Sequence, residues 1–242
     1  MSISIIIPAY NEELLISSTI EAIRQHLIEN FNDGEIIIIN DGSTDHTQLA
    51  IETMIANNST KISLKLLNNA NNRGKGFSVR RGMLASSGNV CVFIDADLPF
   101  KLDVLQEMQT RIFNDFDIVI GDRNNPGSKL VYVHLIRKTA GRIYSSIVQL
   151  VISDGITDTQ CGLKGFSAES AKCIFSKTRI NGFGFDVEVL RIAQKHALSI
   201  SKIPVEMINN RLDSRVHLIR DSILMFWNLV LIKANEWFGY YD

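Results

Sequence analysis

The first half of the chain alternates two patterns of hydrophobic and polar residues. Short runs rich in isoleucine, valine and leucine indicate buried strands. Between them, apolar residues recur every three to four positions, as they do in helices with one buried face. This alternation is typical of βαβ units that build a mostly parallel sheet flanked by helices. We therefore predict an α/β fold with strands at Ser4–Ile7, Glu35–Ile39, Ile62–Leu67, Val90–Ile94 and Ile118–Ile120.

Segments with helical periodicity join these strands. We expect Asn11 to cap the first helix and Ser43 the second, because Asn and Ser side chains accept hydrogen bonds from the exposed N–H groups of a helix start. A third helix is expected to begin near Gly76. The apolar positions that define the buried faces of the first two helices are Leu14, Ile20, Ile23, Leu27, Leu49, Ile51 and Ile55.

The regular alternation ends after Asp122-Arg123. The turn-forming run Asn124-Asn125-Pro126-Gly127 leads into a helix-like segment from Val131 to Ile152. Beyond it, we expect strands at Gly165–Ser167 and Ser199–Val205 and helices at Phe185–His196 and Ser222–Trp237. The last helix is amphipathic. We therefore expect a main domain over residues 1–215 and a C-terminal helix over 216–242 that contacts a bilayer interface, the protein core or a second copy of the chain.

Distinctive polar residues follow three of the predicted strands. In open α/β sheets, ligands bind outside the carboxyl ends of the strands, so residues at these ends should converge on one crevice. They are Pro8-Ala9-Tyr10-Asn11-Glu12 after the first strand, Asn40-Asp41-Gly42-Ser43 after the second and Asp95-Ala96-Asp97 after the fourth.

Asp95 and Asp97 are candidate metal ligands. Side chains two positions apart in an extended segment point to the same side, which makes both carboxylates available to one cation. Mg²⁺ or Mn²⁺ is commonly held by one or two carboxylates together with substrate phosphates. The alternative is an ordinary turn after a buried strand, where aspartate is common. The other motifs at the strand ends favour the metal site.

Arg73-Gly74-Lys75-Gly76 is a candidate anion site. It would open a helix that also carries Arg80 and Arg81, so backbone N–H groups and cations would lie together. The segment is neither a Walker loop nor a GxGxxG fingerprint. The alternative is a solvated basic turn.

Other catalytic signatures are missing from the sequence. The five histidines form no HExxH pair, and no GxSxG motif is present. Cys161 has the chemistry of a nucleophile, but a packing role is favoured because no histidine lies near it in the sequence. These observations argue against a zinc site and against a serine hydrolase.

The overall composition restricts the partners and the compartment. A net charge of −1 over 242 residues argues against nucleic-acid binding. The three cysteines show no pairing pattern, and the N-terminal residues lack the features of a signal peptide, so we expect a cytoplasmic location. The longest apolar stretch, from Ile223 to Ile232, is too short to span a bilayer alone.

Taken in order, these motifs resemble those of a known family, the inverting family-2 glycosyltransferases with a Rossmann-like GT-A fold. The motifs downstream are similar to those of the subgroup that glycosylates polyprenyl phosphates, especially dolichyl-phosphate glucosyltransferases and dolichyl-phosphate mannose synthases. The downstream motifs are Gly121-Asp122-Arg123, Asp158-Thr159-Gln160-Cys161-Gly162-Leu163-Lys164 and Phe185-Asp186-Val187-Glu188.

The resemblance implies a role for each matching position. It implies transfer of a hexose from a nucleotide-sugar to a polyprenyl phosphate with inversion, assisted by Mg²⁺ or Mn²⁺. Nucleotide binding is implied for Pro8, Tyr10, Glu12, Asp41, Lys75, Gly76, Asp95 and Ala96; metal binding for Asp95 and Asp97; catalysis for Asp97, Arg123, Arg137 and Asp158; and contacts to the donor diphosphate for Arg211 and Arg215.

Three details of the sequence concern the donor nucleotide, the acceptor phosphate and the role of Asp158. Asp97 is followed by Leu98-Pro99 where the mannose synthases usually have Leu-Gln, which favours a UDP-sugar such as UDP-glucose over GDP-mannose. Gly141 stands where a hydroxyl residue would help to hold the acceptor phosphate. Asp158 is expected either to orient an arginine or a sugar hydroxyl, or to be a turn carboxylate.

Two alternative functions follow from the same residues. One is a transferase whose acceptor is a sugar hydroxyl, in which Asp158 would have to serve as the general base. The other is a catalytically silent nucleotide-sugar-binding protein, against which the intact Asp95 and Asp97 argue. A lipid acceptor also predicts peripheral contact with a membrane, with apolar and aromatic side chains of the segments 140–152 and 223–241 at the interface. The alternative is that those faces form contacts between the subunits of a homo-oligomer.

Overall fold

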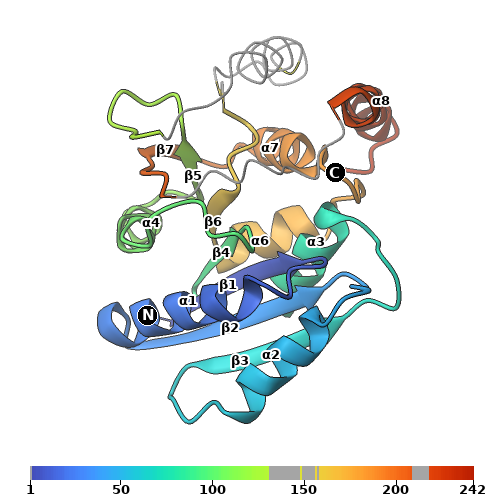
Figure 1. Ribbon diagram of the computed structural model, residues 1–242. Helices are drawn as coiled ribbons and strands as arrows, with labels where there is room; N and C mark the ends of the chain where they lie inside the picture. The colour runs from blue at the N-terminus through green and yellow to red at the C-terminus, as the bar shows by residue number, and fades with distance from the viewer. Residues whose placement is uncertain (1, 131–147, 149–155, 157, 209–217) are drawn as a thin grey trace.

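The structure is a computed structural model that describes residues 2–130, 148, 156, 158–208 and 218–242. Its elements alternate between strands and helices through most of the chain (Figure 1). The strands are β1 (Ser2–Ala9), β2 (Asp33–Asn40), β3 (Ser63–Asn68), β4 (Val90–Ile94), β5 (Ile118–Asp122), β6 (Leu163–Ser167) and β7 (Ile200–Pro204). The helices are α1 (Ile16–Asn30), α2 (Thr47–Ala56), α3 (Lys75–Ala85), α4 (Val104–Phe113), α6 (Ala168–Phe175), α7 (Phe185–Lys195) and α8 (Leu218–Trp237).

The strands form one seven-stranded sheet in the order β3-β2-β1-β4-β6-β5-β7. All neighbours pair in parallel except β6, which runs antiparallel to both β4 and β5. The carboxyl ends of the other six strands therefore lie at one edge of the sheet, and β6 begins at that same edge. The structure confirms the predicted α/β architecture.

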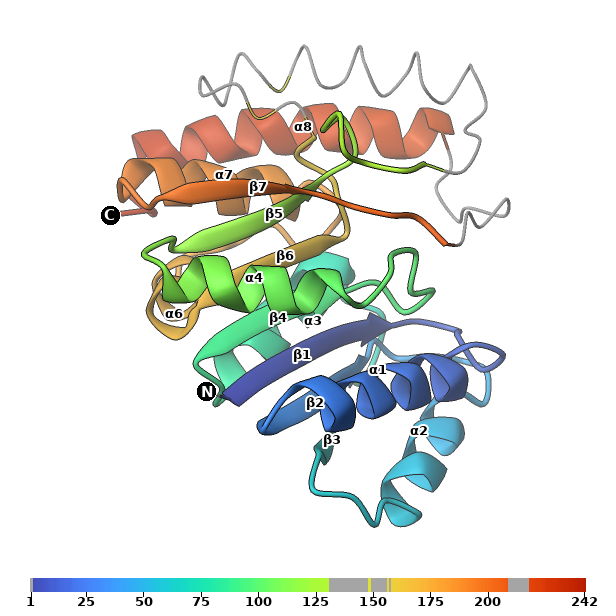
Figure 2. The ribbon, with the colours of Figure 1, turned by 90° about the vertical axis from the view of Figure 1, so that its left-hand side faces the viewer.

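Successive side chains on each strand enter opposite hydrophobic cores. On β1, Ile5 and Ile7 pack on one face with α1, α2 and α4, whereas Ile6 packs on the other with α3, α6, α7 and α8. β4 divides in the same way, with Val92 on the first face and Phe93 on the second. The period of two and burial on both faces explain why these strands read as continuous apolar runs. Figure 2 shows the helices on both sides of the sheet.

The predicted helix caps are wrong. α1 begins after Leu15 and α2 after His46, and neither of these residues caps its helix through its side chain. Instead, the Asn11 amide N–H donates to Ser43 Oγ at 2.9 Å, and Asn11 Oδ1 accepts the Thr44 N–H at 2.7 Å. The two side chains thus join the loops after β1 and β2 to each other, and Asn11 adopts a left-handed backbone with φ 54°.

The C-terminal part of the chain packs on the main body. α8 lies along α7 in Figure 2, and its Leu229 and Ile232 belong to the same hydrophobic core as α7. Arg191 of α7 pairs with Glu236 of α8. The helix-like segment Val131–Ile152 lies outside the described residues apart from Val148, which is helical and buried.

Candidate active site

The loops at the carboxyl edge bring together most of the described candidate residues. Pro8 lies in β1 opposite Ile39 of β2, and Tyr10 and Glu12 follow β1, all three half-buried. The carbonyl of Glu12 accepts the N–H groups of Leu15 and Ile16 and so leads the chain into α1. This edge is where the sequence pattern placed a ligand crevice.

The Asp95-Ala96-Asp97 segment is a turn rather than an extended strand end, contrary to the expected geometry. The Leu98 N–H donates to the Asp95 carbonyl at 3.0 Å, and Leu98 takes a left-handed backbone with φ 44°. Thr19 of α1 donates its hydroxyl to the Ala96 carbonyl at 2.6 Å, which holds the buried middle of the turn. The turn directly follows β4, which ends at Ile94.

Asp95 and Asp97 lie in an environment of opposing charges. Lys75, the first residue of α3, places its Nζ 2.5 Å from Asp95 Oδ1. Burial alone would lower the pKa of Lys75, but the negative charges of Asp95 and Asp186 outweigh it and raise the pKa. Burial raises the pKa of Asp97, and the charge of Asp95 raises it further. A cation beside both carboxylates would stabilise their charged forms, so these residues fit a divalent metal ion.

The space around Asp95 is closed on the side of β6. A Cβ atom at Gly162 would lie 2.0 Å from Asp95 Oδ2, closer than carbon and oxygen atoms that are not bonded to each other can approach. Glycine at this position therefore allows the Asp95 carboxylate to occupy its place at the end of β4. The Gly162 requirement was not recognised in the sequence, where only the motif around it was noted.

Asp41 is buried and holds the loop before α3. Its Oδ1 accepts the Arg73 N–H at 2.9 Å and an Asn69 side-chain N–H at 2.7 Å, and its Oδ2 accepts the Gly74 N–H at 2.8 Å. Gly74, at φ 97°, permits the turn into α3. The N–H groups expected to bind an external anion are thus engaged by an internal carboxylate.

The two arginines farther along α3 contact protein atoms. Arg80 donates to the Thr178 carbonyl at 2.8 Å, and Arg81 donates to the Asn68 carbonyl at 2.6 Å. The guanidinium of Arg73 lies over the Phe77 ring at 4.2 Å. Of the expected basic cluster, only Lys75 reaches the Asp95 turn through a contact that the structure records in its described part.

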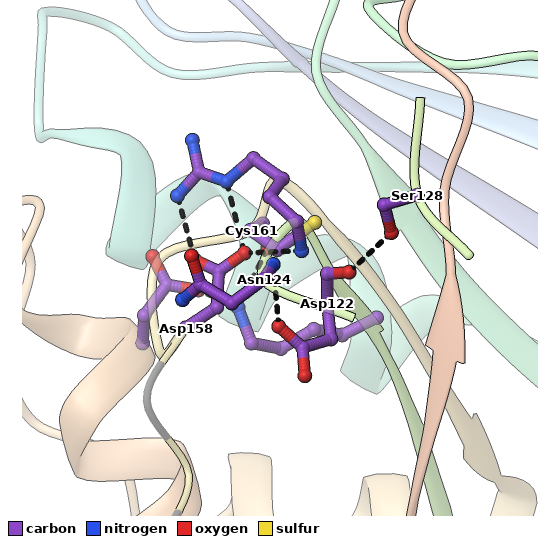
Figure 3. A network of polar contacts seen from close by, with 8 residues as sticks. Asp122, Asn124, Ser128, Asp158 and Cys161 are labelled. Atoms are coloured by element: carbon purple, nitrogen blue, oxygen red, sulfur yellow. Dashed lines mark hydrogen bonds and ion pairs between the residues drawn. The ribbon is translucent and has the colours of Figure 1, made fainter. Parts of the chain in front are cut away.

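A second polar network lies at the end of β5 (Figure 3). Both oxygens of Asp158 accept hydrogen bonds from the Arg123 guanidinium, at 2.7 and 2.9 Å, and Oδ2 also accepts the Arg123 backbone N–H at 2.7 Å. Burial on its own would raise the pKa of Asp158, but these bonds outweigh it and lower the pKa. The neighbouring Asp122 accepts the Asn124 N–H at 2.9 Å, which shapes the following loop. Arg123 is therefore held firmly at the carboxyl edge of the sheet, with its side chain partly exposed.

A buried ion pair joins β6 to α7. Lys164 of β6 is fully buried, forms an ion pair with Asp186 of α7 and donates to the Cys161 carbonyl at 2.7 Å. Burial raises the pKa of Asp186, against the charges of Lys164 and Lys75. No role was assigned to this pair from the sequence. The available signal was a lysine inside the apolar run of β6 and an aspartate at the second position of α7, between Phe185 and Val187.

Cys161 is a packing residue. It is fully buried in the core, and burial, followed by the charge of Asp158, raises the pKa of its thiol to about 12. A thiol that stays protonated at neutral pH is a poor nucleophile. The packing interpretation of Cys161 therefore agrees with the structure.

Three candidate residues, Arg137, Arg211 and Arg215, lie outside the described residues. Within the parts of the chain that are described, no three His, Cys, Asp or Glu side chains gather as a metal site made by protein alone. In the same described parts, no helix combines the length and the apolar character needed to cross a bilayer.

Comparison with known proteins identifies the family. Residues 4–175, which include the loops after β1, β2, β4 and β5, match the sequence profile of Glycosyl transferase family 2. The chain belongs to glycosyl transferase family 2. This family 2 glycosyltransferase is 34% identical to a dolichyl-phosphate beta-glucosyltransferase from Dictyostelium discoideum over 254 aligned residues, which cover 98% of the chain and 75% of the relative. The corresponding enzyme of Saccharomyces cerevisiae is 29% identical over 262 residues, covering 99% and 76%.

Solved structures share the fold of this glycosyltransferase. Glucosyl-3-phosphoglycerate synthase from Mycobacterium tuberculosis in complex with UDP has a TM-score of 0.69 at 20% identity, with coverage of 96% of this chain and 79% of that one. Mannosyl-3-phosphoglycerate synthase from Rubrobacter xylanophilus has a TM-score of 0.70 at 14% identity, with coverage of 98% and 74%. These likenesses confirm the expected GT-A fold.

Proposed function

We propose that this glycosyltransferase moves glucose from UDP-glucose to a dolichyl or related polyprenyl phosphate, with inversion at the anomeric carbon. The observation that carries the proposal is the 34% identity to the Dictyostelium discoideum dolichyl-phosphate beta-glucosyltransferase across nearly the whole chain. The motifs at the carboxyl edge supply the donor half of the site, and the network at the end of β5 supplies the acceptor half.

The donor half consists of the loops after β1, β2 and β4 and the first turn of α3. Pro8, Tyr10 and Glu12 would line the nucleotide, and Ala96 would leave room for it between the two aspartates. Asp41 would contribute to donor binding indirectly. Its oxygens accept the N–H groups of Arg73 and Gly74 and so hold the loop before α3 in place. Lys75 would face the donor, and its ammonium group would exchange the Asp95 carboxylate for a diphosphate oxygen. The buried Gly76 would contribute to nucleotide binding by allowing α3 to pack against Ile180 and Phe185.

A divalent cation, Mg²⁺ or Mn²⁺, fits beside Asp95 and Asp97. Burial first, and then the neighbouring charge of Asp95, raise the pKa of Asp97, and a cation beside the two carboxylates would offset both effects. The Mycobacterium tuberculosis synthase has been solved with Mn²⁺ and with Mg²⁺, which supports this choice. When bound, the ion would offset the charge of the departing diphosphate.

The acceptor half is built around Arg123. A phosphate monoester is largely dianionic at neutral pH, so it can attack the anomeric carbon without a strong base. Arg123, oriented by Asp158, would hold the acceptor phosphate, and Arg137 is proposed to join it. Both oxygens of Asp158 accept bonds from Arg123 and its pKa is lowered, so it is a weak base. This arrangement favours a phosphate acceptor over a sugar hydroxyl.

The remaining proposals concern the end of the chain. We assign Arg211 and Arg215 to the donor diphosphate, and we treat residues 216–242 as an appendage to the catalytic domain of residues 1–215. Exposed aromatic side chains of this appendage, among them Trp227, Trp237 and Phe238, would contact the membrane that carries the acceptor.

A panel of donors and acceptors tests the function. The purified protein is incubated with Mn²⁺ or Mg²⁺, with UDP-glucose or GDP-mannose, and with a short polyprenyl phosphate or a free sugar. We expect release of UDP and formation of glucosyl polyprenyl phosphate, detected by mass spectrometry. Transfer only to the sugar hydroxyl would reject the lipid acceptor, and nucleotide binding without turnover would identify a silent binding protein.

A further inference from the structure

A buried carboxylate, Glu188 of α7, joins two distant parts of the chain. Its two oxygens accept the backbone N–H groups of Arg179 and Ile180 at 2.8–3.0 Å. Glu188 Oε1 also accepts the hydroxyl of Tyr241 at 2.7 Å, and Asn235 of α8 donates to that hydroxyl at 3.2 Å. Glu188 and Tyr241 are both fully buried. The segment after α8 therefore helps to hold the loop of residues 178–182, which precedes α7.

The opposite side of the loop lies against the first turn of α3. The Phe77 N–H donates to the Asn181 carbonyl at 3.2 Å. A Cβ atom at Gly74 would lie 2.5 Å from the Asn181 carbonyl oxygen, and one at Gly76 would lie 2.5 Å from that of Ile180. The backbones are in such close contact that a shift of the loop must be transmitted to the two glycines.

Lys75 stands between these two glycines. Its Nζ lies 2.5 Å from Asp95 Oδ1 and 5.9 Å from the centre of the Phe185 ring. The position of this ammonium group is therefore determined by the contact between α3 and the 178–182 loop. Within the described part of the chain, the hydrogen-bonded cluster of Glu188, Tyr241 and Asn235 makes no hydrogen bond or ion pair to the Asp95 turn.

We propose that the Tyr241–Glu188 pair is a positioning device for the donor site: it holds the 178–182 loop against α3 and thereby sets the position of Lys75. The proposal rests on the donor role given to Lys75 in the proposed function. It assigns to residues beyond α8 a contribution to nucleotide affinity rather than to the chemical step, because Lys75 would contact the donor diphosphate both before and during transfer.

The experiment compares Tyr241→Phe with Tyr240→Phe in the full chain. Tyr241→Phe removes the buried hydroxyl and keeps the ring. Tyr240→Phe removes a hydroxyl from a ring that is 47% exposed and lies beside Arg179, so it serves as the matched control. Two quantities are measured: hydrogen exchange of peptides that cover residues 73–80 and 178–182, and the Kd of UDP with Mn²⁺ by calorimetry.

We expect exchange in both peptides to accelerate at least fivefold in Tyr241→Phe, and the Kd of UDP to rise about five- to tenfold, the scale of one lost hydrogen bond of ordinary strength. Both quantities should stay within about twofold of wild type in Tyr240→Phe. Gly76→Ala, which pushes on the same contact from α3, should also raise the Kd.

Unchanged hydrogen exchange at residues 73–80 in Tyr241→Phe would show that the Tyr241–Glu188 pair does not position the first turn of α3, and it would overturn the proposal. Faster exchange there with an unaltered Kd would overturn the donor role of Lys75 instead. Failure of turnover in wild-type protein affects only the proposed reaction, since neither readout requires turnover.

Discussion

Asp97 and Asp158 are two carboxylates at the same edge of the sheet in opposite surroundings. Burial and a neighbouring negative charge raise the pKa of Asp97, whereas the bonds from Arg123 lower the pKa of Asp158 against the effect of burial. Among the described residues, no ion pair to Asp97 is found, whereas Asp158 is paired with Arg123. At the scale of single residues, this difference separates a candidate metal ligand from a residue that orients an arginine.

Replacing Asp97 tests the metal role. In Asp97→Asn, the side chain keeps its size and loses the charge that would bind the cation, so we expect kcat/KM to fall by about two to three orders of magnitude. Initial rates at a series of Mn²⁺ concentrations measure the change. Asp33→Asn, at the exposed amino end of β2, is the control and should retain normal rates. Near-normal turnover in Asp97→Asn would remove the proposed ligand.

Glu35 predicts how stability depends on pH. Burial alone would raise its pKa, but hydrogen bonds from Lys65, Ser4 and Ser87 outweigh burial and lower the pKa from 4.5 to about 2. A carboxylate with a lowered pKa stabilises the fold fully above pH 4.5, and this contribution is lost as the pH falls toward 2. The shift corresponds to about 3 kcal/mol at pH 7.

We therefore expect Glu35→Gln to lower the free energy of unfolding by about 2–3 kcal/mol at pH 7, and by less than half of that near pH 3. Urea titrations at both pH values measure the difference from wild type. Glu169→Gln, an exposed residue of α6, should change stability by less than about 0.5 kcal/mol. An effect of Glu35→Gln that does not depend on pH would contradict the proposed charge interactions.

At the scale of elements, the connection between α3 and β4 packs directly on β1. A Cβ atom at Gly88 would lie 2.7 Å from the Ser4 backbone nitrogen and 2.9 Å from the Ile3 carbonyl carbon. Because these are backbone atoms of a central strand, they cannot move aside cheaply. We expect Gly88→Ala to destabilise the protein by about 2–3 kcal/mol, measured as the free energy of unfolding in urea.

Gly182 provides the matched comparison for that substitution. A Cβ atom there would meet nothing within 4 Å, so Gly182→Ala should be neutral within about 0.5 kcal/mol. Equal destabilisation by both substitutions would indicate a general cost of replacing glycine rather than the collision with β1.

The sequence predicted the elements that bury a continuous apolar pattern. β4 was predicted with its observed bounds, because all five of its residues are buried. α4 and α6 were not predicted, since they are short and α4 buries only Leu105 and Met108. The caps were misassigned because Asn11 finds its partners at Ser43 and Thr44, in a separate loop.

For the candidate site as well, the sequence identified some residues and missed others. The residues at strand ends could be identified from topology, because parallel strands bring their carboxyl ends together. The buried Lys164–Asp186 pair and the fit of Gly162 against Asp95 depend on contacts between remote segments. Local patterns carry no information about such contacts, so these residues required the three-dimensional structure.

At the scale of the whole molecule, large apolar side chains are exposed along α8 and just beyond it. Trp237 is 88% exposed and Phe238 is 69% exposed, while Leu229 and Ile232 of the same helix lie in the core. Aromatic side chains of this kind favour the interfacial region of a bilayer. The helix thus packs on α7 with one face and offers the other for the proposed membrane contact.

Vesicle binding measures that contact. Wild-type protein should sediment with vesicles of phosphatidylcholine and phosphatidylserine, and replacing Trp237 and Phe238 together by serine should weaken binding at least about tenfold. Phe113→Ser, which alters a 63% exposed residue of α4 on the other face of the sheet, is the control. Equal binding by both variants and wild type would argue against an interface at α8.

The single antiparallel strand, β6, has an evolutionary consequence. Because β6 starts at the edge where β5 ends, the chain leaves the sheet after Asp122 and re-enters it at Leu163 on the same edge, whereas the proposed donor motifs at the ends of β1, β2 and β4 lie before residue 98. If the acceptor binds at Arg123 as proposed, one contiguous stretch of the gene encodes its surroundings. Recombination or insertion within that stretch would then be expected to change the acceptor and to leave the donor motifs at the strand ends unchanged.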